Sequence, residues 1–333
     1  MNRFSSEKSL VYHCVADRFP AELPQNISWS KLEALLAREN LKPLFYDWLK
    51  RQATLREAAP KDFLEKLQQS YYHAAARNAL NQEAVKPLFA ALREKNIPVL
   101  LHKGIYLMNQ IYSSIALRPM GDIDLLIRPE NRSAVLEALV SLKFKKGKDE
   151  ETWSNDFVAL DLHTDLNNTK RFQKVSPCLS LRMEQMWKGA KAIDFDGIPL
   201  LALNREDQLI ALCFHLAFNH RLEGLLWYAD LIRYLKIYRN ELDWEKLIRR
   251  AKEFGNQKSV FYCLKYLQDH FEISLPTKIL EALKPSEQSW MEKKIAGRIW
   301  KGKPAGKLGY FFSLGLIEEK KMRRRYFWNT WLS

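Results

Sequence analysis

Residues 97–127 read IPVLLHKGIYLMNQIYSSIALRPMGDIDLLI, and this stretch decides the fold. Its first five residues form a short apolar, β-favouring run, which predicts a strand over 97–101. Apolar residues then recur at three- and four-residue spacing, which predicts a helix over 105–117 that ends before a Pro and a Gly. The alternation of acidic and apolar residues that follows predicts a second strand over 122–127. The order is therefore strand, turn, helix, strand.

Two acidic residues, Asp122 and Asp124, lie two positions apart on the second predicted strand. Side chains of a strand alternate between the faces of a sheet, so both carboxylates point one way and Ile123 points to the packed side. Adjacent carboxylates repel each other unless a positive charge lies between them. Mg²⁺ prefers one or two carboxylates together with substrate phosphates. The pair predicts a site for Mg²⁺, with Mn²⁺ as the alternative ion.

The turn before the helix carries Lys103 and Gly104. The N-terminus of a helix attracts anions, and a glycine there allows the backbone to approach a phosphate closely. Lys103 adds a point charge, and Arg118 follows at the other end of the helix. We expect Lys103, Gly104 and Arg118 to bind nucleotide phosphates, although an ordinary turn and a helix C-cap are the simpler interpretations.

A third acid is expected on a later strand. The sequence predicts strands over 144–148 and 157–166, joined by a charged loop. On the second of these, Asp161 shares a face with His163 and Asp165, so this strand can aim Asp161 at the same place as the Asp-x-Asp pair. Three carboxylates that bridge two metal ions are the arrangement of in-line phosphoryl transfer. Asp165 is the rival acid, and His163 is expected to hold Asp161 or a phosphate.

A second Asp-x-Asp, at 194–196, is followed by Gly197 and is flanked by two β-favouring runs. An Asp-Gly pair between such runs is typical of a type I′ hairpin turn. Turn chemistry therefore explains these acids, and they are not candidate metal ligands.

The ordered set Lys103-Gly104, Arg118, 121–127 and 160–163 resembles the DNA polymerase β-like nucleotidyltransferase superfamily. More narrowly it is similar to a bacterial branch of largely uncharacterised nucleotidyltransferases, which also share a helical C-terminal part with a segment like 227–230. The resemblance implies a nucleotidyltransferase that uses Asp122, Asp124 and Asp161 as catalytic metal ligands. It also implies that Lys103, Gly104, Arg118 and His163 bind the nucleotide.

The rest of the chain is predicted to be helical on both sides of this core. Apolar residues at helical spacing fill 1–95 and continue from 204 onward. The expected fold class is α+β, with a small mixed sheet flanked by helical regions. The expected division is a helical N-terminal region (1–95), a nucleotidyltransferase core (96–202) and a helical C-terminal domain with a basic aromatic tail (203–333).

Composition and charge narrow the class of protein. The 333 residues are 47% hydrophobic with only 12 Gly and 13 Pro, which excludes disordered and collagen-like chains. No apolar run approaches the roughly 20 residues that span a bilayer. Half of the net charge of +14 lies in residues 287–333, which hold eleven Lys or Arg and four Asp or Glu. This aromatic, basic tail predicts an anionic surface or nucleic acid as partner, unless it is simply a helix with a solvated basic face.

The start of the chain lacks a continuous apolar segment, and the four cysteines stand alone, so we expect a cytoplasmic protein without disulfides. The predicted function is Mg²⁺-dependent transfer of a nucleoside monophosphate from an NTP, with ATP as the expected donor, to an unidentified small-molecule, glycan or peptide acceptor. One alternative is a core that binds a nucleotide, RNA or a protein partner without catalysis. The other is a glycosyltransferase that holds a sugar nucleotide through its Asp-x-Asp.

Overall fold

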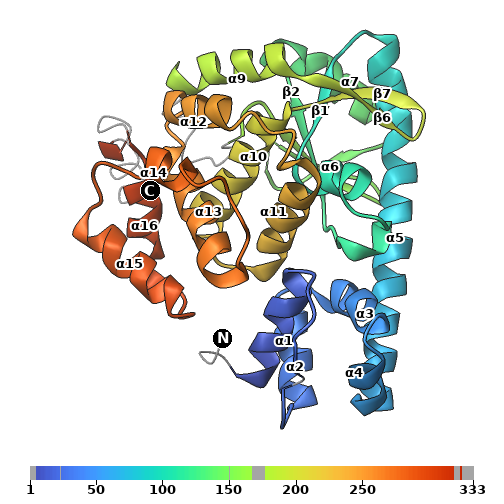
Figure 1. The fold of residues 1–333 in the computed structure, drawn as a ribbon. Coiled ribbons are helices and arrows are strands. Elements are labelled where there is room, and N and C mark those ends of the chain that lie inside the picture. The colour runs from blue at the N-terminus through green and yellow to red at the C-terminus, as the bar shows by residue number, and fades with distance from the viewer. Residues whose placement is uncertain (1–4, 23, 150, 167–176, 319–322, 325–333) are drawn as a thin grey trace. The chain divides into compact units, whose positions relative to one another are not determined.

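The computed structural model describes residues 5–22, 24–149, 151–166, 177–318 and 323–324. The chain divides into two compact units: the first comprises residues 1–164 and 192–202, and the second comprises 165–191 and 203–333. The helices and strands of both units are labelled in Figure 1. The predicted α+β class is confirmed, because helices accompany a single mixed sheet in the described part of the chain.

The first unit begins with helices, as predicted for 1–95. They are α1 (Ser6–Val15), α2 (Trp29–Arg38), α3 (Lys42–Lys50), α4 (Ala53–Ala58) and α5 (Lys61–Glu94). Helix α5 is 34 residues long and appears in Figure 1 as one continuous rod. It is rich in Ala, Leu, Lys and Glu, which are strong helix formers. Because it packs against α3 and β7, this helix ties the N-terminal helices to the sheet.

A seven-stranded mixed sheet forms the centre of the first unit, with the order β3-β4-β5-β2-β1-β7-β6. Its strands are β1 (Val99–Leu101), β2 (Ile123–Ile127), β3 (Lys145–Lys146), β4 (Thr152–Ser154), β5 (Ala159–His163), β6 (Lys191–Phe195) and β7 (Ile198–Ala202). Strand β2 pairs antiparallel with β1 and parallel with β5. Strand β4 was predicted as loop, and that prediction is wrong. Its extended conformation is stabilised by antiparallel pairing with β5 on one side and with β3 on the other.

The helix predicted over 105–117 is shorter than expected. Helix α6 (Lys103–Gln110) ends where the amides of Ile111 and Tyr112 both bond to the carbonyl of Leu107, at 2.8 and 3.0 Å. The Ser114 hydroxyl then accepts from the Ala116 amide and starts the separate 3₁₀ turn η1 (Ile115–Leu117). A short 3₁₀ turn, η2 (Pro129–Asn131), and α7 (Arg132–Ser141) follow β2.

The predicted hairpin turn is present between β6 and β7. Asp196 and Gly197 both have positive φ, at 51° and 81°, as a type I′ turn requires. The Asp194 carboxylate accepts from the Gly197 amide, and Asp196 pairs with Lys86 of α5. These acids therefore serve the turn and its packing.

The second unit is helical. Its elements are α9 (Pro177–Gly189), α10 (Arg205–Phe214), the π-helical turn η3 (His215–Asn219), α11 (Leu225–Tyr238), α12 (Trp244–Glu253), α13 (Gln257–Phe271), α14 (Ile279–Leu283), α15 (Trp290–Trp300), the 3₁₀ turn η4 (Gly306–Leu308) and α16 (Gly309–Leu316). Helix α9 was not predicted. The cysteines whose side chains are described, Cys14, Cys213 and Cys263, are buried and form no disulfide.

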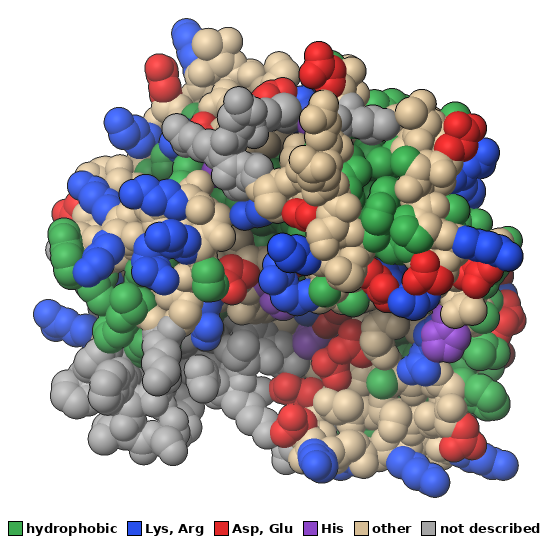
Figure 2. All heavy atoms as spheres, turned by 90° about the horizontal axis from the view of Figure 1, so that it is seen from below, with side chains coloured by type: hydrophobic (Ala, Val, Ile, Leu, Met, Phe, Trp, Pro, Cys, Tyr) green, Lys and Arg blue, Asp and Glu red, His purple; other side chains and the backbone are tan. Residues whose placement is uncertain are grey.

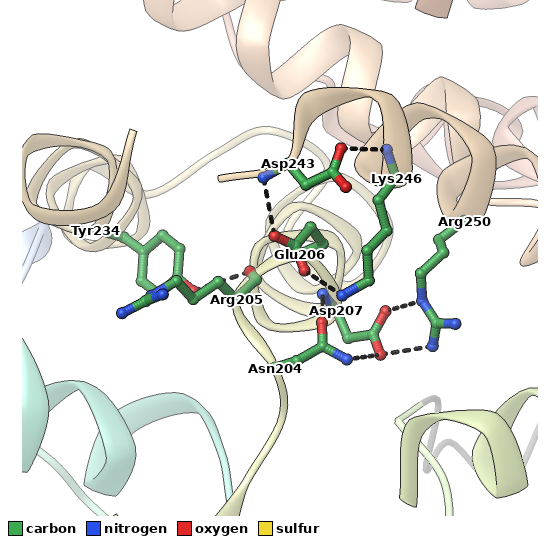
Figure 3. Close-up of polar contacts among 8 residues, drawn as sticks. All are labelled: Asn204, Arg205, Glu206, Asp207, Tyr234, Asp243, Lys246 and Arg250. Atoms are coloured by element: carbon green, nitrogen blue, oxygen red, sulfur yellow. Dashed lines mark hydrogen bonds and ion pairs between the residues drawn. The ribbon is translucent and has the colours of Figure 1, made fainter. Parts of the chain in front are cut away.

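A polar network joins three helices of the second unit (Figure 3). The fully buried Asp207 of α10 makes a bidentate ion pair with Arg250 of α12 and accepts from the Asn204 amide. Next to it, Glu206 bonds to Lys246 and to the backbone amide of Asp243. Figure 3 also shows Tyr234 of α11 bonded to the carbonyl of Arg205. Buried charges need such partners, so this network fixes how α10, α11 and α12 pack.

No helix in the described ranges is long and apolar enough to cross a membrane. On the face drawn in Figure 2, basic side chains are spread over the surface with acidic side chains among them. Residues 319–322 and 325–333 of the basic aromatic tail lie outside the described residues. The partner expected for that tail therefore stays a prediction.

Candidate active site

The structure brings three acids to neighbouring positions of the sheet. In the parallel pairing of β2 with β5, Asp124 lies directly opposite Asp161, and Leu126 lies opposite His163. Asp122 directly precedes β2 and shares its alternation with Asp124. The Asp-x-Asp pair and the third acid therefore lie on one face of two adjacent strands.

The acids are close enough to act on one another electrostatically. Asp122 lies at the exposed start of the strand, yet partial loss of hydration raises the pKa of its carboxyl, and the charges of Asp124 and Asp161 raise it further. Lys103 acts in the opposite direction but does not cancel them. Such crowding of negative charge is what a bound cation relieves.

Asp124 is the most strongly paired of the three acids. Its Oδ1 lies 2.6 Å from Lys103 Nζ and 2.6 Å from His163 Nε2. Burial opposes the charge of Asp124, but Lys103 and the hydrogen bond with His163 outweigh it, so the pKa of this carboxyl is well below its usual range. His163 thus contacts Asp124, and not Asp161 as one of the expectations had it.

The position of Lys103 depends on an unusual backbone conformation. Lys103 is the first residue of α6 and has a φ of 52°, which is the left-handed region that L-residues avoid. Its side chain is largely buried and reaches from the start of α6 to Asp124 on β2. Backbone strain of this kind persists where surrounding structure holds it, and it is common at functional sites.

His102 is a member of the cluster that the sequence analysis missed. It is buried, and its ring lies 5.5 Å from that of His163. Burial, and then the charge of Lys103, lower the pKa of His102 well below its ordinary value, which keeps the ring neutral. In the described part of the chain neither ring nitrogen of His102 has a hydrogen-bond partner. Its place directly after a buried strand and before the Lys-Gly turn was the available signal.

Thr152 is a second residue that sequence reasoning did not find. It lies on β4 opposite Asp161, and its hydroxyl donates to Asp161 Oδ1 over 3.0 Å. This bond fixes the orientation of the third carboxylate. Because β4 is short and surrounded by charged residues, nothing in the pattern distinguished it from a loop.

Gly104 and Arg118 pack against each other. A Cβ added to Gly104 would lie 3.0 Å from Arg118 Nη1 and 2.9 Å from Met120 Sδ. The Arg118 guanidinium is buried and donates to the carbonyl of Pro119, and its own carbonyl accepts from Asn78 of α5. Glycine is therefore needed at position 104 because the side chains of Arg118 and Met120, which precede β2, pack closely against the start of α6. The role of both residues in nucleotide binding stays a prediction.

The donor set fits a divalent cation. Asp122, Asp124 and Asp161 offer carboxylate oxygens of the kind that Mg²⁺ prefers. His102, Asp124 and His163 form a second set whose ligand atoms lie within 4.8 Å of one another. Asp124 belongs to both sets, and the orphaned nitrogens of His102 suit an ion that accepts nitrogen as well as oxygen.

The comparison with protein families matches residues 25–272 to an uncharacterised nucleotidyltransferase family, so the chain belongs to that family. The match spans β1, β2 and β5 and continues through α13 of the second unit. The resemblance drawn from the Asp-x-Asp segment is thereby confirmed. Comparison with curated proteins and with solved structures finds no significant match.

Proposed function

We propose that the protein transfers a nucleoside monophosphate from an NTP to a hydroxyl or phosphate oxygen of an acceptor and releases pyrophosphate. The observation that carries this proposal is the register between β2 and β5, which sets Asp161 opposite Asp124 on the face that the alternation also gives to Asp122. Nucleotidyl transfer is the activity that the family name describes, which favours it over the sugar transfer that an Asp-x-Asp also serves.

The carboxylates would hold Mg²⁺, which when bound would neutralise the phosphates and lower the pKa of the attacking oxygen. Asp122 and Asp124 lie together at the start of β2, where they would hold the ion that binds the triphosphate. Asp161, fixed by Thr152, takes the proton of the acceptor hydroxyl. The acceptor oxygen forms a new bond to the α-phosphorus, and the bond from that phosphorus to the β-phosphate oxygen breaks, so that pyrophosphate leaves in line.

Lys103 has two roles in this proposal. In the absence of ligand its ammonium neutralises Asp124. Its four-carbon side chain is flexible, so Nζ can turn from Asp124 to the phosphates as the nucleotide enters. His163 keeps its bond to Asp124 throughout and orients that carboxylate.

The test is ligand binding and turnover of the full-length chain with each of the four NTPs and Mg²⁺. We expect one NTP to raise the melting temperature only with Mg²⁺ present, and pyrophosphate to appear when a suitable acceptor is added. Asp122→Asn and Asp124→Asn should abolish the Mg²⁺-linked shift. Asp196→Asn, which alters the other Asp-x-Asp, should not.

The same experiment separates catalysis from simple binding. Mg²⁺-linked nucleotide binding without pyrophosphate release across a broad panel of acceptors would favour the non-catalytic module. A melting temperature that no NTP changes, with or without Mg²⁺, would contradict the proposal itself.

A further inference from the structure

Two histidine rings of the second unit face each other across a short gap. His215 Nε2 lies 3.1 Å from His220 Nε2, and the ring centroids are 4.6 Å apart with the planes at 73°. Both residues are half-buried. Nothing in the nucleotidyltransferase site described above uses this pair.

A π-helical turn creates the pair. In an α-helix, residues five apart lie about 140° from each other around the axis, so their side chains diverge. Here residues 215–219 form the wider π-helical turn η3, in which the His220 amide donates to the His215 carbonyl over 3.3 Å. The widened turn brings positions 215 and 220 to the same side. Single π turns inside helices are frequent at functional sites.

The two rings do not meet end-on, as a straight N–H···N hydrogen bond would require. A straight N–H···N bond of this length would place the ring centroids about 5.4 Å apart, because each nitrogen lies about 1.15 Å from its ring centre. The observed centroid separation of 4.6 Å is shorter, so at least one ring is turned away from the line between the nitrogens.

Two imidazole nitrogens bound to one cation at 2.0–2.1 Å, with an angle of about 90–110° between them, lie about 2.9–3.4 Å apart, with ring centroids about 4.5–5.2 Å apart. Both observed distances match this geometry. We propose that His215 and His220 form a binding site for a divalent cation of the Zn²⁺ class, with its remaining positions open to water or to a small ligand. Imidazole is a preferred ligand of such ions, whereas Mg²⁺ prefers oxygen.

The surrounding chain holds the rings in place. Trp227 of α11 stacks on His220 with centroids 4.5 Å apart and meets His215 edge-on at 4.9 Å. A Cβ at Gly224 would lie 2.7 Å from the Trp227 ring, so glycine is required there. Arg221 and Leu222 also have positive φ, at 55° and 61°, which is costly for residues with a Cβ. The rings are thus held in this arrangement before any ion binds.

Asn219 lies where a ligating histidine needs support. Its amide lies 3.2 Å from His215 Nδ1. Metal-bound histidines usually donate their other ring N–H to an oxygen. Turning the Asn219 amide over moves no heavy-atom position and places Oδ1 where it accepts from Nδ1–H, which leaves Nε2 free of its proton for the cation.

The test is a calorimetric Zn²⁺ titration of the full-length protein, repeated with Co²⁺ and followed by visible absorption. His215→Gln and His220→Gln should each remove one equivalent of Zn²⁺, and Asn219→Leu should weaken that equivalent about tenfold. His73→Gln, a change at an exposed histidine of α5, should leave it intact. His163→Gln should also leave this equivalent intact. It should remove only the Zn²⁺ that binds to the His102, Asp124 and His163 cluster of the first unit.

A second measurement needs no variant. Zn²⁺ should protect His215 and His220 of the wild-type protein from diethyl pyrocarbonate, as read by mass spectrometry of peptides. The proposal is overturned if the wild-type protein binds no Zn²⁺, if His215→Gln and His220→Gln retain every equivalent, or if Zn²⁺ protects other histidines and leaves these two reactive.

Discussion

Lys103 Nζ lies 2.6 Å from Asp124 Oδ1, so a cationic side chain at the start of α6 neutralises the central carboxylate of β2. Both side chains are largely buried, and His163 is the other neighbour bonded to that oxygen atom. The ammonium therefore occupies the region that a metal ion and phosphates would share. When no ligand is present, this ion pair reduces the repulsion among the neighbouring carboxylates and so stabilises the folded protein.

Removal of this ammonium should destabilise the ligand-free protein. In Lys103→Met, Asp124 loses its cationic partner and keeps the bond with His163, so the free energy of unfolding should fall by about 1–3 kcal/mol. Mg²⁺ should raise the melting temperature of the variant more than that of the wild type, because it no longer competes with an internal cation. Lys86→Met removes two surface ion pairs and should leave stability nearly unchanged. Equal stability and equal Mg²⁺ shifts in Lys103→Met and wild type would contradict this account.

A methyl group at Gly104 should disturb the packing under α6. Gly104→Ala places a Cβ within 3.0 Å of the buried Arg118 and Met120 side chains, so one or both must move. We expect a loss of about 1–2 kcal/mol in urea unfolding. Gly121→Ala is the matched control, since no atom lies within 4 Å of the added Cβ, and it should be neutral within about 0.5 kcal/mol. If the two variants are equally stable, the close packing at Gly104 is not required.

The sequence predicted the parts of the site that depend on strand periodicity. A period of two places Asp122 and Asp124 on one face of β2 and Asp161 on one face of β5, and the pairing of these strands follows that phase. What a pattern along one strand does not contain is the offset between strands. For that reason His163, two residues beyond Asp161, was not assigned to Asp124, which its ring contacts.

The missed elements have local causes. The apolar pattern runs through Ile111 to Ile115 without interruption, so it hid the hydrogen bonds that end α6 at Gln110 and the cap that Ser114 supplies to the next turn. Strand β4 is only three residues long, and pairing with its neighbours, not propensity, keeps it extended. Thr152 was missed together with that strand.

Low pH should lower the stability of the second unit because Glu206 becomes protonated. Burial acts to raise the pKa of this carboxyl, but Lys246 and the Asp243 amide outweigh it, so its pKa lies below the ordinary 4.5. A depressed pKa contributes stability that is fully present above the unfolded pKa and is lost as pH falls through the folded one. The wild type should therefore be more stable than Glu206→Gln near neutral pH, and the difference should shrink as the pH falls below the ordinary pKa of 4.5.

Urea unfolding of both proteins across this pH range measures the effect. Glu245→Gln, a change at an exposed position of α12, is the control and should track the wild type at every pH. If the difference in unfolding free energy between wild type and Glu206→Gln stays constant down to the lowest pH measured, the ion pair does not set the pH dependence.

Replacement of Asp161 should affect turnover much more than nucleotide binding. It lies on β5, not on the strand of the Asp-x-Asp pair, and its Oδ1 is held by Thr152. In the proposed reaction it accepts the acceptor proton, whereas Asp122 and Asp124 position the triphosphate. Asp161→Asn should keep most of the Mg²⁺-linked nucleotide affinity and slow pyrophosphate release by several orders of magnitude, because transition-state stabilisation is lost while ground-state binding remains. Asp124→Asn should damage both.

Two further variants make this result specific. Thr152→Val keeps the carboxylate but removes the hydroxyl that orients it, so turnover should fall about tenfold with binding unchanged. Asp165→Asn changes the acid two residues beyond the end of β5 and should be mild. Nucleotide affinity and pyrophosphate release, measured side by side on the four variants, decide the matter. An inactive Asp165→Asn beside an active Asp161→Asn would assign the third carboxylate to Asp165, and four variants that match the wild type would leave these acids without a catalytic role.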